Sequence, residues 1–248
     1  MFHEVEDKAF LSRMRCHCGE IMQQLCHVLK EKYDVGAQFR LVGSGARNLI
    51  LQNANKPIDL DYNLWIMRGM EKADGRVIKE AARKALNLVL REYGYGECQD
   101  STSALTTPKI HFGRGNQTEF SIDICIVREC RDGYERLIHE KTGWTYWDRY
   151  YWNDVPHSER LSEKVSLVKS QGKWGQVREE YIKLKNRYLS DNDHHPSFIC
   201  YSEAVNNVYN QLTSVERRLV PGFQPMVFVS GSLSQNGQDG IVHGNCLW

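Results

Sequence analysis

Two stretches of the chain alternate hydrophobic and polar residues, and each carries aspartate on its polar side. Over residues 58–66 every second residue is hydrophobic, which is the period of a strand with one buried face. Asp59 and Asp61 occupy polar positions of this strand, so their carboxylates should point from one face. Residues 120–127 alternate in the same way and place Asp123 on the polar face. The pattern predicts a cluster of three carboxylates if the two strands are neighbours.

Hydrophobic residues spaced three to four positions apart predict helices around these strands. They occur within residues 1–33, over 77–93, and in three segments between residues 158 and 212. Residues 105–112 predict a further strand, which Pro108 interrupts. The predicted fold class is therefore α+β, with a small, mixed, twisted sheet, flanking helices and a C-terminal helical domain.

These elements divide the chain into four parts. Residues 1–33 are predicted to pack as a helix on the core, residues 34–152 to form the domain with the sheet, and residues 153–220 to form the helical domain. Residues 221–248 are rich in Gly, Ser, Asn and Gln and predict a loop-rich tail. The aromatic residues of 144–152 can stack on a ligand or pack between two domains, and we favour packing.

Composition narrows the functional classes. The 248 residues include 32 lysines and arginines against 31 aspartates and glutamates, and this net charge of +1 does not call for a nucleic-acid partner. No hydrophobic run approaches a membrane span, and the charged N-terminus lacks the hydrophobic segment of a signal peptide. We therefore expect a cytoplasmic protein without a membrane partner. The eight cysteines are scattered, which indicates reduced thiols and no disulfide partner.

A Gly-Ser pair precedes the first aspartate strand. The hydrophobic residues before Gly43 predict a short strand, and residues 46–51 predict the start of a helix. Gly43 and Ser44 would then lie at a strand-to-helix turn, where free backbone N–H groups and the helix dipole favour phosphate. Carboxylate oxygens are ligands of Mg²⁺, which also binds the phosphates of substrates. Turn and carboxylates together suit a nucleoside triphosphate.

The Gly-Ser turn, the Asp-x-Asp pair and the hydrophobically flanked Asp123 resemble the nucleotidyltransferase superfamily with the polymerase-beta-like catalytic core. The resemblance covers about residues 35–130 and does not assign a subfamily. It implies an enzyme that transfers a nucleoside monophosphate from a nucleoside triphosphate, ATP first among them, to an acceptor hydroxyl with release of pyrophosphate. The acceptor stays open: a small molecule, a second nucleotide, an RNA end or a protein side chain.

The resemblance also implies roles for individual residues. Two Mg²⁺ ions, or Mn²⁺ in their place, would be bridged by Asp59 and Asp61, and Asp123 would hold the ion that activates the acceptor hydroxyl. Gly43 and Ser44 would bind the β- and γ-phosphates. Positive charge could come from three further residues, each of which a surface role explains equally well or better: Arg47, Lys164 and Lys169.

Two other functions are kept as alternatives. Arg187 and His194 have the spacing of the HEPN ribonuclease family, a helical fold, which would make the C-terminal helices a toxin-like ribonuclease. The fold could also serve nucleotide binding without catalysis, although three retained aspartates count against that. The chain contains its own comparison, because Asp191 and Asp193 form a second Asp-x-Asp in a polar stretch that predicts a loop.

Overall fold

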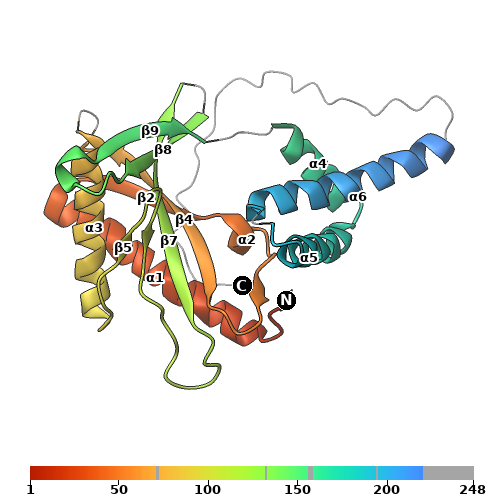
Figure 1. The fold of residues 1–248 in the computed structure, drawn as a ribbon, viewed down its shortest axis with the longest axis horizontal. Helices are drawn as coiled ribbons and strands as arrows, with labels where there is room; N and C mark the ends of the chain where they lie inside the picture. The colour runs from red at the N-terminus through yellow and green to blue at the C-terminus, as the bar shows by residue number, and fades with distance from the viewer. Residues whose placement is uncertain (71–72, 132, 156–158, 194, 220–248) are drawn as a thin grey trace, which may run out of the picture.

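The structure, a computed structural model, describes residues 1–70, 73–131, 133–155, 159–193 and 195–219. A twisted mixed sheet forms its centre, two long helices cover one face of that sheet, and three more helices gather at one end (Figure 1). This arrangement confirms the predicted α+β class with C-terminal helices. The predicted tail, residues 221–248, lies outside the described residues.

The main sheet has the strand order β2-β4-β7-β6-β5, and β8 and β9 extend it as a hairpin beyond the far half of β7. Of its pairings, only that of β4 with β7 is parallel among the described strands. Every second residue from Ile58 to Leu64 of β4 and from Phe120 to Ile126 of β7 is buried, as predicted, and β7 also buries Ser121 and Val127. The strands are β2 (Gly36–Leu41), β4 (Ile58–Arg68), β5 (Gln99–Asp100), β6 (Leu105–Thr106), β7 (Phe120–Cys130), β8 (Gly133–Glu140) and β9 (Arg149–Asp154).

The helices α1 (Lys8–Tyr33) and α3 (Gly75–Glu92) pack on the hydrophobic face of this sheet. Asp7 begins α1 by accepting a hydrogen bond from the Phe10 N–H, and the side chain of Asp74 accepts one from the Arg76 N–H at the start of α3. The main core consists of hydrophobic residues of both helices and of the inner positions of β4 and β7. Because the helices occupy that face, the polar face of β4 and β7 points away from them.

The chain differs from its prediction around the Gly-Ser pair. Residues 46–51 do not begin a helix: α2 (Gly43–Ala46) is four residues long, and β3 (Leu51–Asn53) follows. Asn48 adopts a left-handed backbone conformation with φ of 56°, which stops the helix, and the Leu49 N–H donates to the Ser44 carbonyl. Before α1, residues 2–4 form β1 (Phe2–Glu4), which pairs with β3. The N-terminal helix is therefore shorter than predicted.

The C-terminal helices α4 (Glu159–Ser170), α5 (Trp174–Ser190) and α6 (Ser197–Leu219) form the predicted three-helix unit around a second core. Leu49 from the turn after α2 is buried in that core, so the helical unit is attached to the sheet domain at the Gly-Ser turn. Asn186 adds hydrogen bonds to the backbone of Phe2. Within the described residues, no helix is both long and hydrophobic enough to cross a membrane.

The aromatic patch does not pack between domains, contrary to our prediction. Trp144 and the residues of η1 (Thr145–Trp147) lie in the connection between β8 and β9, where the rings of Trp144, Tyr146 and Trp147 are between two-thirds and five-sixths exposed. Tyr150 and Trp152, both on β9, do pack against the main core. Within the described part of the chain, the helical unit joins the sheet domain elsewhere and does not cover these rings.

Candidate active site

Strands β4 and β7 bring the three predicted aspartates to one face of the sheet. Asp61 pairs directly with Asp123 in the parallel register, and Asp59 pairs with Ser121. Paired residues of neighbouring strands point to the same side, so all three carboxylates leave the face opposite α1 and α3. Asp59 is exposed, whereas Asp61 and Asp123 are half-buried.

Two hydroxyl groups bind these carboxylates. Ser121 Oγ donates to Asp59 Oδ1 at 2.5 Å, and Thr106 Oγ1 donates to Asp123 Oδ1 at 2.5 Å. The sequence pattern placed Ser121 on the polar face of its strand, but it gave no signal for Thr106, which arrives from the neighbouring β6. These hydrogen bonds fix the orientations of the Asp59 and Asp123 carboxylates beside Asp61.

The crowding of the carboxylates changes their acidity. Burial, together with the charges of Asp123 and Asp59, raises the pKa of Asp61 from 3.8 to about 6, and Arg47 partly opposes this. Burial and the charge of Asp59 also raise the pKa of Asp123, against the hydrogen bond from Thr106. Both shifts mean that negative charge at this site is costly, and a bound cation would remove that cost.

The donors fit a hard divalent cation, but their present orientations do not form a closed site. Among the described residues, no three His, Cys, Asp or Glu side chains are arranged to hold a metal ion. The hydrogen bonds from Ser121 and Thr106 engage one oxygen each of Asp59 and Asp123. The oxygen-only donor set with two destabilised charges suits Mg²⁺, which needs few protein ligands beside substrate phosphates.

The Gly43 turn lies directly against Asp61. Gly43 has a φ of +62°, and a side chain at this position would place its Cβ 2.3 Å from Asp61 Oδ2. The Val42 N–H also donates to the Asp61 carbonyl at 2.8 Å, which fixes the turn to the strand. Since α2 is only four residues long, its dipole is small, and the backbone N–H groups of the turn are the groups available to phosphate.

Of the three predicted cationic residues, one lies at this site. The Arg47 guanidinium lies 4.3 Å from the centre of the Tyr201 ring of α6, and its charge lowers the pKa of Asp61. Lys164 instead donates to Asn206 at 2.7 Å, and the Lys169 amine lies 4.7 Å from the Trp174 ring. Both lysines therefore interact within the helical unit.

The residues of the ribonuclease alternative are not both described. Arg187 donates to Glu203 and to the Tyr188 hydroxyl, and Tyr188 also donates to Glu203. This side-chain network joins α5 to α6. His194 lies outside the described residues, so the Arg-His pair of that alternative stays a prediction.

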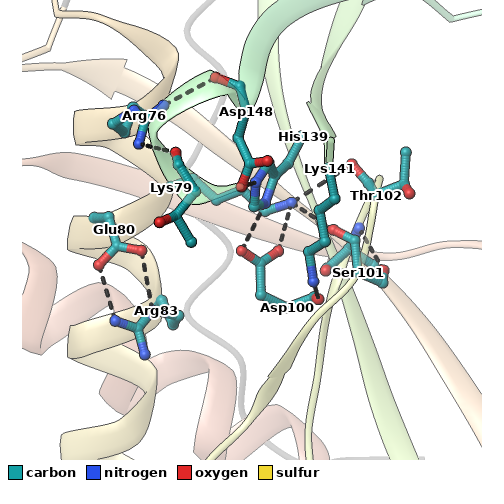
Figure 2. Close-up of polar contacts among 12 residues, drawn as sticks. Arg76, Lys79, Glu80, Arg83, Asp100, Ser101, Thr102, His139, Lys141 and Asp148 are labelled. Atoms are coloured by element: carbon teal, nitrogen blue, oxygen red, sulfur yellow. Dashed lines mark hydrogen bonds and ion pairs between the residues drawn. The ribbon is translucent and has the colours of Figure 1, made fainter. Parts of the chain in front are cut away.

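A second polar cluster, which the sequence did not reveal, ties α3 to the β8–β9 hairpin (Figure 2). The buried ring of His139 lies between two carboxylates, with Nδ1 2.8 Å from Asp100 Oδ2 and Nε2 3.0 Å from Asp148 Oδ2. Lys79 of α3 forms an ion pair with Asp100 at 2.8 Å, and Arg76 donates to the Asp148 carbonyl at 2.9 Å. The cluster anchors the base of the exposed aromatic connection.

Solved structures with a similar fold are known. The Vibrio cholerae cyclic AMP-GMP synthase DncV, in complex with the linear intermediate 5′ pppA(3′,5′)pG, matches with a TM-score of 0.54 and 10% identity over 82% of this chain and 68% of that one. This chain shares the nucleotidyltransferase-like fold of that synthase. A mutant of the Vibrio cholerae di-nucleotide cyclase, with two aspartates changed to alanine, matches with a TM-score of 0.50 and 7% identity over 73% of this chain.

The nucleotidyltransferase fold confirms what the sequence resemblance implied about architecture. The chain spans 62% of the length of the mutant cyclase, so more than a third of that protein has no counterpart here. No family model and no curated protein matches the sequence. At these identities the likeness concerns the fold, and the chemistry has to be argued from the site itself.

Proposed function

We propose that this protein transfers a nucleoside monophosphate from a nucleoside triphosphate to an acceptor hydroxyl and releases pyrophosphate. The observation that carries the proposal is the parallel pairing of Asp61 with Asp123 beside the Gly43 turn. Three carboxylates on one open face, two of them with raised pKa values, form a donor set for divalent cations next to backbone groups suited to phosphate.

The residues take the following parts in this proposal. Asp59, Asp61 and Asp123 would hold two Mg²⁺ ions, or Mn²⁺. For this, Asp59 would turn from the Ser121 hydroxyl and Asp123 from the Thr106 hydroxyl. Bound there, the ions would supply neutralisation of the triphosphate and activation of the acceptor hydroxyl. Asp123 would also be the carboxylate that accepts the proton of that hydroxyl.

The phosphates would be bound at the turn. Gly43 and Ser44 would face the β- and γ-phosphates, and Arg47 would add positive charge from the side of the helical unit. We do not extend the proposal to Lys164 and Lys169, because their amines contact Asn206 and Trp174. As the acceptor we propose a second nucleotide, since a solved structure of this fold holds a linear dinucleotide intermediate.

The test is a transfer assay with α-labelled nucleoside triphosphates and Mg²⁺ or Mn²⁺, read by pyrophosphate release and by the mass of the labelled product. We expect Asp61→Ala to abolish transfer, because it removes the carboxylate shared by the cluster. Asp191→Ala is the matched control, since it alters the second Asp-x-Asp in an exposed position after α5. Label transfer that persists in Asp61→Ala, or that is lost equally in both variants, would refute the assignment.

A further inference from the structure

The surface has a hollow of about 540 Å³ that does not include the three aspartates. It lies at the C-terminal ends of β4 and β7 and at the start of β8. The parallel pairing of β4 with β7 ends at Trp65 and Val127, and beyond that point β7 pairs with β8 on its other side. The end of β4 therefore has β2 on one side and the hollow on the other. Its volume lies within the range of roughly 300–1,000 Å³ that is usual for small-molecule sites.

Aromatic rings form the walls of the hollow. The rings of Trp65 and Tyr134 are 5.7 Å apart between centroids and nearly perpendicular, at 82°. Tyr134 is 45% exposed, so its ring is available to a ligand, and Trp152 lines the side toward the main core. Perpendicular rings offer a face and an edge to a third ring, which can stack on the first and contact the edge of the second.

Positive charge gathers at the same place. The Arg40 guanidinium lies 5.5 Å from the centre of the Trp65 ring, and Arg68 lines the hollow from the end of β4. Among the described side chains, neither arginine has a carboxylate within ion-pair distance. Arg128, by contrast, is paired with Glu135 at 2.7 Å. The remaining acid of the lining, Glu129, is exposed, so two guanidinium groups stay available to an anion.

The hollow is separate from the carboxylates, and its lining comes from both faces of the sheet: Trp65 stands on the carboxylate face, whereas Ile66 and Ile78 belong to the face that α3 covers. Trp65 stands four residues beyond Asp61 on β4, so the side chains point to the same side and their Cα atoms are about 13 Å apart. Gln38 pairs with Trp65 and Arg40 pairs with Asn63, which brings β2 side chains onto that face as well. A ligand in the hollow can therefore bind without displacing phosphate or metal at the Gly43 turn.

We propose that this hollow is a binding site for a planar aromatic molecule that carries a negative charge. The ring would stack on Trp65 beside Tyr134, and the anionic group would meet Arg40, whose guanidinium lies nearest the Trp65 ring. Two sources share this chemistry: a nucleoside phosphate, and an aromatic carboxylic acid. The inference stands independently of the transferase proposal, because binding here needs neither metal nor turnover.

The test is isothermal titration calorimetry in the presence of EDTA with two anionic probes, guanosine 5′-monophosphate and 1-naphthoate. Each has a neutral counterpart, guanosine and 1-naphthalenemethanol. We expect at least one anionic probe to bind, at least fivefold more tightly than its counterpart. Arg40→Gln should weaken the binding of that anionic probe about tenfold without changing the binding of its neutral counterpart. Trp65→Leu should weaken both members of the pair, because it removes the stacking surface.

Two controls separate this site from other surfaces. Arg149→Gln changes an exposed arginine that is paired with Glu140 on the β8–β9 hairpin, and it should leave the titrations unchanged. Asp61→Ala should also leave them unchanged, which separates this result from any failure of the transfer assay. Arg40 is exposed on an edge strand, so its variant keeps the inference testable even if Trp65→Leu does not fold.

The outcomes divide cleanly. Binding of the monophosphate alone assigns a nucleotide, and binding of the naphthoate alone assigns an aromatic acid. Either result, with the expected loss in Arg40→Gln, supports the site. The proposal is overturned if neither anion binds at millimolar concentration, or if the affinity of the bound anion is the same in Arg40→Gln as in the unchanged protein.

Discussion

Replacing Asp61 with asparagine is expected to stabilise the metal-free protein while removing its proposed activity. The carboxyl of Asp61 is half-buried beside Asp123 and Asp59, and these surroundings raise its pKa from 3.8 to about 6. Asparagine has nearly the same shape but no charge to bury or repel. The crowding that suits a cation therefore costs stability whenever no cation is bound.

The size of the effect follows from that pKa. Each pKa unit corresponds to about 1.36 kcal/mol, so the shift of Asp61 is equivalent to about 3 kcal/mol at neutral pH. Water reaches part of the site and the neighbouring carboxylates can move, so we expect about half, roughly 1–2 kcal/mol. In a protein of this size that gain raises Tm by about 2–8 °C.

The gain should depend on pH in a defined direction. The native carboxyl binds its proton more tightly than the unfolded one, so the stability of the unchanged protein falls as pH rises from 3.8 to about 6. Asp61→Asn lacks this slope. Its advantage should be largest above pH 6 and should shrink toward zero as pH falls to 3.8.

The assay is thermal unfolding followed by circular dichroism in EDTA at pH 7.5 and at pH 4.5. Asp191→Asn, an exposed aspartate at the end of α5, is expected to leave Tm unchanged at both values. Added Mg²⁺ should then raise the Tm of the unchanged protein and have a smaller effect on Asp61→Asn, because a ligand stabilises only the state that binds it. A Tm for Asp61→Asn at pH 7.5 equal to or below that of the unchanged protein would refute the reasoning about crowded carboxylates.

Two further outcomes follow from single contacts. Gly43→Ala should abolish transfer, because its Cβ would clash with the Asp61 carboxylate, whereas Gly94→Ala, with similar φ but open space around it, should lose about 1–2 kcal/mol of stability and keep activity in the same assay. The N–H of Thr142, and then His139, lower the pKa of Asp148, so the stability that this carboxylate gives is present above pH 3.8 and lost as pH falls further. Near-ultraviolet circular dichroism should show the aromatic connection loosening in that range, and Asp148→Asn should lack this acid transition; an unchanged acid profile in Asp148→Asn would contradict the anchoring role.

The strand period was enough to predict the face that carries the aspartates. Asp59, Asp61 and Asp123 could be assigned to one face because alternation is local and each strand buries its other side against helices. Whether the two strands are neighbours could not be predicted from the sequence, and the structure shows that they pair. Thr106 could not be predicted at all, because a hydroxyl in a two-residue strand has no pattern of its own.

The turn after Gly43 shows why a local pattern can fail. The run over residues 46–51 predicted the start of a helix, yet Leu49 is buried in the core of the helical unit and Ile50 in the core of the sheet domain. A segment shared between two cores cannot keep one helical face, and Asn48 ends the helix before it. The prediction that the aromatic residues of 144–152 pack between two domains failed for a related reason. Hydrophobicity alone does not say which surface another domain will cover.

The parallel pairing of β4 with β7 makes the aspartate cluster depend on closure of a long stretch of chain. Asp59 and Ser121 pair in the sheet next to Asp61 and Asp123. They are 62 residues apart in sequence, and α3 lies between them. A parallel pair needs such a crossover, so the carboxylates cannot meet in any partly folded chain in which these strands are still separate. Metal affinity would therefore report completion of the sheet, and a chelator would act on the finished protein rather than on its folding intermediates.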